Sequence, residues 1–233
     1  MAPSGPIFIV GSGPMIGSHI ACLFATHTFT KVAIFSRSTA NHSRDASFVT
    51  SAAPSASVHT YAADATEHTA LSIALKKAVS EVGVPEVVVF NAARLNFGGT
   101  LLVGQYATAD IIEDFKIPNL GLYTTASVLL PQLQALTKSH PDAHPALFVT
   151  SLKLIHQPFA PVFSISMAKA AQASLAKLLT EENKNVVHVA LVTVSGQVSP
   201  EEEVNNPANI ATKFWELYEQ EKWSWEFEMK CGL

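Results

Sequence analysis

A glycine-rich segment near the start of the chain has the composition of a phosphate-binding turn. It reads Gly11-Ser12-Gly13-Pro14-Met15-Ile16-Gly17 and directly follows a short apolar run, Ile7–Val10. Glycines let the backbone turn tightly onto the N-terminus of a helix, where free N–H groups and the helix dipole attract phosphate. A simple tight turn is the alternative. The position of the motif between a predicted strand and a predicted helix favours nucleotide binding.

Side chains that could act on a substrate follow a later apolar run, Val87–Phe90. They are Arg94 and Asn96. In open α/β sheets, ligands bind beyond the carboxyl ends of the strands, where both residues are expected to lie. Arg94 could hold a carbonyl or carboxylate group of a substrate, and a salt bridge within its loop is an equal alternative.

The loop after the next apolar run, Leu147–Val149, supplies Lys153 and His156. An imidazole titrates near neutral pH, so His156 could donate a proton in a reaction, with an ordinary surface histidine as the alternative. Lys153 is a further candidate for contact with substrate. The same loop contains apolar residues that either form one wall of a substrate pocket or pack into the core, namely Leu154, Pro158, Phe159 and Phe163.

Short apolar runs rich in β-branched residues recur along the chain and predict the strands that position these loops. Continuous rather than alternating apolarity indicates strands buried on both faces, which is typical of parallel sheets. The predicted strands are Ile7–Val10, Val32–Phe35, Val58–Tyr61, Val87–Phe90, Leu147–Val149 and Val186–Val194, with a short last strand at Trp225–Met229.

The segments between these runs have the length and composition of helical crossovers. Asn206 is a good N-cap and Pro207 suits the first position of a helix that ends near Glu221. The segment Ser36–Ser57 is rich in Ser, Ala and Asn and is expected to be a surface loop with a weak helix. The other predicted helices are Ile16–Ala25, Glu67–Val82, Ala109–Ile117, Asn119–Leu136 and Val162–Glu182.

Alternating strands and helices predict an α/β fold, a Rossmann-type doubly wound parallel sheet with the strand order 3-2-1-4-5-6-7. The chain of 233 residues is long enough for one large core and too short for two ordinary domains, so a single domain over residues 1–233 is expected.

Composition excludes several classes of function. The net charge is only −4 and no basic stripe is present, which argues against nucleic acid and anionic membranes as partners. No apolar run approaches the roughly 20 residues that a membrane-spanning helix needs. Two cysteines, Cys22 and Cys231, lie at opposite ends of the chain and indicate free thiols in a reducing, cytoplasmic compartment. No metal site is expected.

The sequence around the glycine motif, IFIVGSGPMIGSHIA, resembles the opening TGxxxGIG of the short-chain dehydrogenase/reductase family. Further landmarks extend the resemblance over nearly the whole chain. Met15 stands at the family's middle glycine, where its side chain is expected to crowd the cofactor diphosphate and weaken binding. The cofactor-binding residues that the resemblance implies in this motif are Gly11, Ser12, Gly13, Ile16 and Gly17.

The resemblance also implies which cofactor binds. Ser36 stands where NAD-preferring members carry an acidic residue, and the neighbouring Arg37 suits the 2′-phosphate of NADP(H), because a guanidinium makes paired, charge-assisted hydrogen bonds. Asp64 matches the family's adenine-contacting aspartate, and Asn91 opens the counterpart of its NAG motif. The alternatives are a solvated loop residue for Arg37 and a helix cap for Asp64.

The resemblance implies the catalytic residues of this family, which are an Asn, a Ser, a Tyr and a Lys that together form a proton relay. In this relay the lysine lowers the tyrosine pKa and binds the cofactor ribose. Lys169 stands at the lysine position, with a snorkelling surface lysine as the alternative. Ile165 occupies the tyrosine position and cannot donate a proton. The serine position falls on Leu152, and Ser151 takes that role only if the loop shifts by one residue.

Pro118 stands at the position of the relay asparagine, with Asn119 beside it, and predicts a kink in the helix. One of the four relay residues therefore clearly remains, and the candidate catalytic residues are Lys169, Ser151 and His156.

Three functions stay open at this point. The first is a non-standard NADP(H)-dependent reductase that acts on a small, largely apolar metabolite. The second is a non-redox cyclase, isomerase or dehydratase of secondary metabolism that reuses the cleft, and the third is a non-catalytic binding protein. The resemblance implies a homodimer or higher homo-oligomer built on Ala109–Ile117 and Asn119–Leu136. The short acidic segment Ser195–Asn206 predicts a pocket that is open or completed by a partner subunit.

Overall fold

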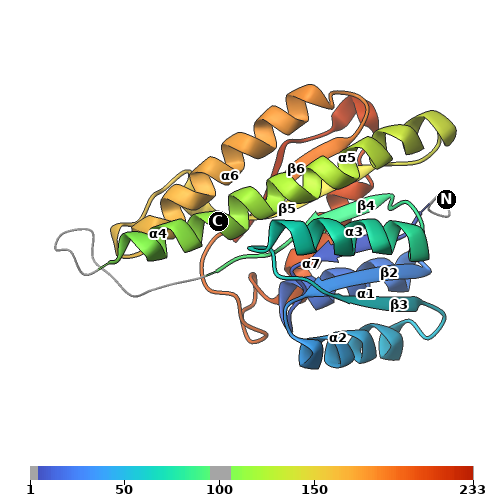
Figure 1. Ribbon diagram of the computed structural model, residues 1–233, viewed down its shortest axis with the longest axis horizontal. Helices are drawn as coiled ribbons and strands as arrows, with labels where there is room; N and C mark the ends of the chain where they lie inside the picture. The colour runs from blue at the N-terminus through green and yellow to red at the C-terminus, as the bar shows by residue number, and fades with distance from the viewer. Residues whose placement is uncertain (1–4, 95–105, 233) are drawn as a thin grey trace.

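The computed structural model describes residues 5–94 and 106–232, and it contains one seven-stranded sheet in the order β3-β2-β1-β4-β5-β6-β7 (Figure 1). Every pair of neighbouring strands is parallel. Both features confirm the prediction of a single doubly wound domain. The strands are β1 (Ile7–Val10), β2 (Lys31–Ser36), β3 (Ser57–Ala62), β4 (Val87–Phe90), β5 (Ala146–Leu152), β6 (His188–Val194) and β7 (Glu228–Cys231).

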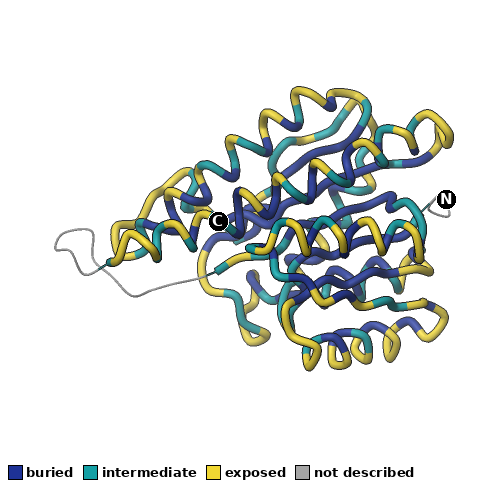
Figure 2. Tube along the Cα trace, in the orientation of Figure 1, coloured by how far each residue is buried: buried dark blue, intermediate teal, exposed yellow. Residues whose placement is uncertain are grey.

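Helices cover both faces of this sheet (Figure 1). One buried apolar cluster joins the sheet to α3, α5 and α6, and a second cluster joins its other face to α1 and α7. The five central strands of the sheet are accordingly almost wholly buried, whereas the two edge strands are more exposed (Figure 2). The α-helices are α1 (Ile16–His27), α2 (Thr39–Ala52), α3 (His68–Val82), α4 (Thr108–Phe115), α5 (Leu122–Ser139), α6 (Phe163–Glu182) and α7 (Pro207–Tyr218).

The segment Ser36–Ser57, expected to be a surface loop with a weak helix, contains a regular helix of 14 residues, α2. Its buried side chains are His42, Asp45 and Val49, spaced three and four residues apart on one face. Two of these three are polar, so the helical period carries almost no hydrophobic signal in the sequence.

The predicted break at Pro118 takes a different form from a kink between two helices. A π-helix, η1 (Lys116–Gly121), joins α4 to α5, so the chain stays helical from Thr108 to Ser139. Proline cannot donate a backbone hydrogen bond, and a locally widened turn accommodates that loss.

The last strand also differs from its prediction, since β7 begins at Glu228 rather than Trp225. The Trp225 ring instead stacks on the His188 ring with centroids 4.8 Å apart. Aromatic and apolar character therefore reflects ring packing at this position and not a strand.

Two glycines allow α1 to pack closely against the carboxyl end of β1. Gly11 has φ +91°, and a Cβ there would lie 2.3 Å from the backbone nitrogen of Ala92. A Cβ on Gly17 would lie 2.9 Å from Ser12 Cα and 3.1 Å from the Gly11 carbonyl oxygen. A side chain at Gly11 would collide with the chain after β4, and a side chain at Gly17 would push α1 away from the glycine turn.

We expect Gly17→Ala to lower the free energy of unfolding by about 1–3 kcal/mol, the usual cost of overpacking. Gly13→Ala is the matched control, because a Cβ on Gly13 meets no atom within 4 Å, and its effect should stay within about 0.5 kcal/mol. Urea denaturation of the two variants measures the difference. Equal effects would contradict the role assigned to Gly17.

Candidate cofactor cleft

A cavity of about 550 Å³ lies at the carboxyl ends of β1, β2 and β4. This is the edge of an open parallel sheet at which ligands bind. Most of the cofactor residues predicted from the sequence line it, namely Gly11, Ser12, Gly13, Ser36, Arg37, Asp64 and Asn91. Ile16 and Gly17 lie outside the lining, in the first turn of α1 behind the glycine turn.

The glycine turn presents the start of α1 to this cavity. Backbone N–H groups of Gly11 and Ser12 both donate to the Phe35 carbonyl, which fixes the turn against β2. No side chain caps the N-terminus of α1, so its first N–H groups and the helix dipole can attract an anion. Met15 lies outside the cavity lining, and its carbonyl oxygen is 2.7 Å from His19 Nδ1.

The buried carboxylate of Asp45 binds the glycine turn through Ser12, and the sequence analysis did not predict this contact. Ser12 Oγ donates to Asp45 Oδ2 at 2.6 Å, and the Arg44 guanidinium pairs with Asp45 Oδ1 at 2.7 Å. The Asp45 side chain is fully buried. Because Asp45 belongs to the weakly patterned α2, its place under the glycine turn has no local signal in the sequence.

Arg37 and Asp64 both line the cavity. Arg37 is exposed at the end of β2. Asp64 Oδ1 accepts hydrogen bonds from the backbone N–H and hydroxyl of Thr66, at 2.9 and 2.8 Å. These bonds make Asp64 the start of a turn that leads into α3, in addition to its place in the lining.

The Asn91 side chain joins three strands. Its Nδ2 donates to the Gly11 carbonyl at 2.8 Å, and its Oδ1 accepts from Thr150 Oγ1 at 2.7 Å. Asn91 therefore connects the ends of β1, β4 and β5, and both ends of its amide are engaged within the protein.

Lys169 is buried, with 2% of its surface exposed, which rules out the surface-lysine alternative. Its Nζ donates to the Thr150 carbonyl and to Gln172 Oε1, both at 2.8 Å. Burial lowers the pKa of Lys169 to about 7. Ile165, one turn earlier on α6, is also buried.

Ser151 lies near the carboxyl end of β5, fully buried, and its Oγ has no hydrogen-bond partner among the described residues. Side chains alternate along a strand, so Ser151 shares a face of β5 with Leu147 and Val149, which pack in the cluster that includes α6. It does not line the cavity described above. Leu152, at the family's serine position, is half-buried.

His156 is bound to the edge of the sheet. Its Nε2 lies 2.7 and 2.9 Å from the two carboxylate oxygens of Glu228, on β7. Burial favours a higher pKa for Glu228, but the neighbouring Thr193 hydroxyl, the His156 imidazole and the Lys230 ammonium together hold that pKa below its usual value. Lys153 and Phe159, from the same loop, are exposed.

Arg94 forms ion pairs with two carboxylates of α4. Its guanidinium lies 3.1 Å from Asp110 and 3.2 Å from Asp114, and the Asp114 side chain is fully buried. The Tyr106 hydroxyl also donates to Asp114, and burial followed by this bond raises the pKa of Tyr106. Asn96, the other candidate of this loop, lies outside the described residues.

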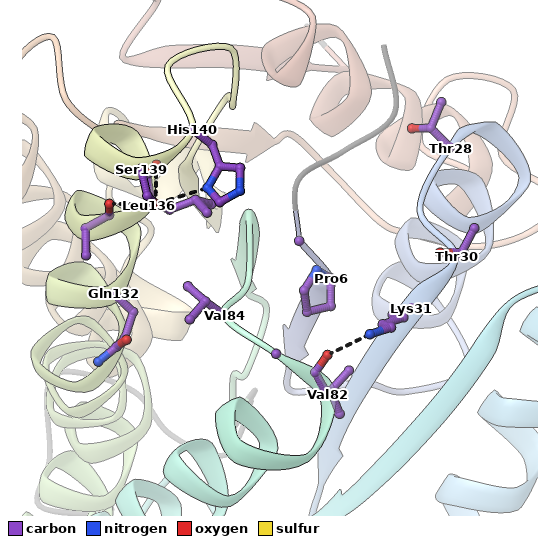
Figure 3. Close-up of a pocket in the computed structure, with 13 residues that line it drawn as sticks. Pro6, Thr28, Thr30, Lys31, Val82, Val84, Gln132, Leu136, Ser139 and His140 are labelled. Carbon is purple, nitrogen blue, oxygen red and sulfur yellow. Dashed lines mark hydrogen bonds between the residues drawn. The ribbon is translucent and has the colours of Figure 1, made fainter.

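A second cavity, of about 480 Å³, lies at the opposite, amino-terminal ends of the strands (Figure 3). Its walls come from the start of β1 and from the chain around Lys31, Val82 and His140. The Lys31 ammonium lies 3.4 Å from the Val82 carbonyl. No residue from the glycine turn or from the ends of β4 and β5 reaches this cavity, so it is not the candidate site.

Over the described residues, no group of three or more His, Cys, Asp or Glu side chains could hold a metal ion. None of the helices in the same part of the chain combines the length and apolarity needed to cross a membrane.

Solved structures with the same fold are short-chain dehydrogenases and reductases. A short-chain dehydrogenase from Rhodopseudomonas palustris has 21% sequence identity and a TM-score of 0.80, with 97% of this chain and 96% of that one covered. A metagenomic short-chain oxidoreductase in complex with NADP has 19% identity and a TM-score of 0.84, with both chains fully covered. A 3-ketoacyl-(acyl-carrier-protein) reductase from Brucella melitensis, complexed with NADH, has 17% identity and a TM-score of 0.84, with 98% and 96% covered.

No protein-family model and no curated protein matches the sequence. At these identities the structural likeness establishes the fold, which is that of the short-chain dehydrogenase/reductase structures over essentially the whole chain.

We expect Arg94→Met to lower the free energy of unfolding by about 1–3 kcal/mol, because it leaves the buried Asp114 carboxylate without its cation. Adding Asp114→Asn should recover much of that loss. Lys116→Met, which removes an exposed ion pair with Glu113, is the control and should cost less than about 1 kcal/mol. Urea denaturation measures the free energy of unfolding of each variant. Unchanged stability in Arg94→Met would contradict a structural role for Arg94 and would favour its alternative role in substrate binding.

Proposed function

We propose that the protein is a non-standard NADP(H)-dependent reductase that acts on a small, largely apolar metabolite. The observation that carries the proposal is the cavity over the glycine turn, which is lined by Arg37, by Asp64 and by the glycine residues that lead into the uncapped α1. NADP(H) would use all three features, namely donors for the diphosphate, a polar partner for adenosine and a cation for the 2′-phosphate.

Arg37 supports NADP(H) over NAD(H). It is exposed at the end of β2, beside a neutral Ser36 instead of an acidic residue. A guanidinium can bind the 2′-phosphate through paired, charge-assisted hydrogen bonds. The solved structures of similar fold include complexes with NADP and with NADH, so the preference rests on the residues of this chain.

Reduction without the family tyrosine is chemically feasible for some substrates. Hydride transfer requires a nicotinamide held next to an electrophilic carbon, and an iminium group is cationic before the hydride arrives. Such a substrate needs no proton from the position of Ile165. The exposed Phe159 and the loop around it offer apolar contacts for a small metabolite.

A non-redox cyclase, isomerase or dehydratase is the second candidate, and Ile165 favours it. The buried isoleucine replaces the acid/base of the relay, while an orienting cleft alone can supply roughly 7–11 kcal/mol of a barrier. Hydride transfer from deuterated NADPH to product distinguishes the two, because a non-redox enzyme leaves no deuterium in the product.

We expect Arg37→Ala to weaken NADPH binding about 10–100-fold, the value of a lost hydrogen bond to a charged group, and to leave NADH binding unchanged. Arg37→Lys, which keeps the charge and loses the paired geometry, should fall between. Fluorescence titration of both cofactors measures the preference. Equal affinity of the wild-type protein for NADH and NADPH would count against the proposal, whereas weak binding of both, relieved by Met15→Gly, would identify crowding by Met15.

We expect no oxidation of simple secondary alcohols with NADP⁺, because the residue at the tyrosine position is Ile165. Where proton-coupled turnover of a substrate is found, His156→Ala should reduce it by roughly 10²–10⁴-fold, the usual range for a lost general acid or base. Steady-state assays over a panel of ketones, iminium ions and alcohols measure both. Turnover indifferent to His156 but abolished by Lys169→Met at saturating NADPH would assign the chemistry to the lysine.

We also propose a homodimer through α4 and α5. This face carries large exposed apolar side chains, among them Ile112, Phe115 and Tyr123. Sedimentation at micromolar concentration should give a dimer, and Phe115→Asp with Tyr123→Asp should give a monomer. Ile73→Asp, at an exposed apolar position on α3, is the control that should remain dimeric. A monomeric wild-type protein would refute this assembly.

A further inference from the structure

Gln172 lies between Lys169 and the π-helix, and no feature of the sequence pointed to it. Its Oε1 accepts from Lys169 Nζ at 2.8 Å, and its Nε2 donates to the Pro118 carbonyl at 2.9 Å. Gln172 is fully buried. The chain of hydrogen bonds thus runs from the lysine through one side-chain amide to the carbonyl at the relay-asparagine position.

We propose that Gln172 is a positioning residue that controls the charge of the Lys169 amine and thereby couples nucleotide binding to the uptake of one proton. The coupling to nucleotide rests on the proposed function of the cleft. The control of the charge is a property of the unliganded protein and can be measured separately.

The two hydrogen bonds fix which way the Gln172 amide faces. A carbonyl oxygen can only accept, so the NH₂ group must face Pro118, and the amide oxygen must face the lysine. A second hydrogen bond joins the π-helix to α6, from Asn119 Nδ2 to the Ala168 carbonyl at 3.0 Å. Lys169 therefore meets two neutral acceptors in fixed positions, the Gln172 amide and the Thr150 carbonyl.

Neutral acceptors offset only part of the cost of burying a charge. Lys169 forms no ion pair with any residue in the described ranges, and burial alone accounts for its lowered pKa of about 7. The amine consequently changes charge close to physiological pH, about three units below an ordinary lysine.

Charged groups on the neighbouring elements do not supply the missing partner. β5 and the short helix Ala160–Val162 contain no titratable side chain. On α4, Asp110 and Asp114 pair with Arg94, and Glu113 pairs with Lys116 of the π-helix. Lys153, in the turn after β5, is exposed. On β6, His188 lies at the far end of the strand and burial lowers its pKa to about 4, which leaves it neutral.

Lys169 is connected to the cleft by two hydrogen bonds. It donates to the Thr150 carbonyl, and the Thr150 hydroxyl donates to Asn91, which lines the cavity. A bound diphosphate places negative charge near this amine and favours its protonated form. Above pH 7 the free protein holds a neutral amine, so binding must take up a proton, and affinity should fall by at most about tenfold per pH unit.

Gln172→Glu tests the control of the charge, because it puts a carboxylate in place of the amide oxygen. Gln172→Met removes both hydrogen bonds. The matched control is Gln157→Glu, which makes the same charge change at an exposed loop position. The chemical shift of ¹³Cε-labelled lysine, followed against pH in the unliganded protein, reports the ionisation of each amine, and the resonance lost in Lys169→Met assigns Lys169.

The expected midpoint for Lys169 lies near pH 7 in the wild-type protein and in Gln157→Glu. It should rise by about 1–3 units in Gln172→Glu, the usual effect of an adjacent opposite charge, and fall in Gln172→Met. A wild-type midpoint above pH 9, or a midpoint near 7 that neither Gln172 variant moves, would overturn the control by Gln172.

The coupling is tested by calorimetric titration with NADP⁺ at pH 8 in two buffers of different ionisation enthalpy. The wild-type protein should take up close to one proton, Gln172→Glu about half a proton or less, and Lys169→Met close to none. Uptake that is unchanged in Lys169→Met would overturn the coupling. Absence of NADP⁺ binding, together with the expected shifts in the lysine midpoint, would reject the proposed function and the coupling while supporting the control by Gln172.

Discussion

The hydrogen bonds of the Asn91 side chain hold together the part of the sheet on which the cleft depends. One end of the amide binds the Gly11 carbonyl at the glycine turn, and the other end accepts from Thr150 on β5. The Thr150 backbone carbonyl also accepts a hydrogen bond from Lys169. The Asn91 amide therefore fixes the glycine turn, which we call the nucleotide side of the cleft, relative to Lys169 and α6, which we call the relay side. An error in the position of Asn91 would displace both.

The two sides differ in how many of the residues expected from the family resemblance they contain. On the nucleotide side, the cavity lining, the close approach of α1 and the exposed guanidinium of Arg37 keep the requirements of dinucleotide binding. On the relay side, Ile165 supplies no proton, Ser151 is buried, and the Lys169 amine is held by neutral acceptors. The two other candidates already have partners within the protein, since Arg94 forms ion pairs with Asp110 and Asp114 and His156 makes hydrogen-bond contacts with Glu228. The arrangement therefore suits binding and orientation of a nucleotide better than proton transfer to a substrate.

The sequence predicted what is determined locally. Continuous apolar runs identified the parallel strands, and the glycine spacing identified the turn that opens the cleft, because these patterns reflect burial and backbone geometry of neighbouring residues. The helix α2 was expected only as a weak helix within a surface loop, since its buried face consists of His42, Asp45 and Val49. Pro118 signalled an irregular helix, but the choice of a π-helix over a kink depends on contacts with α6 made by Asn119 and Gln172.

The partners of the site residues were beyond prediction for the same reason. Asp45 under Ser12, Gln172 beside Pro118 and Glu228 against His156 are separated by 33, 54 and 72 residues from the groups they contact. Such pairings arise from the way whole elements pack and leave no spacing in the sequence. The consequence is that most residues lining the cavity could be predicted from the sequence, whereas the burial and the hydrogen-bond partners of Lys169 could not.

The most direct test of the central claim, that this cleft binds NADP(H), is a crystal structure of the protein grown with saturating NADPH. The account predicts the diphosphate at the start of α1, the 2′-phosphate within hydrogen-bond distance of Arg37, and adenine beside Asp64. It also predicts a ribose hydroxyl within reach of the Lys169 amine. A structure at saturating NADPH with no nucleotide over the glycine turn, or with nucleotide bound in another cavity, would contradict the account.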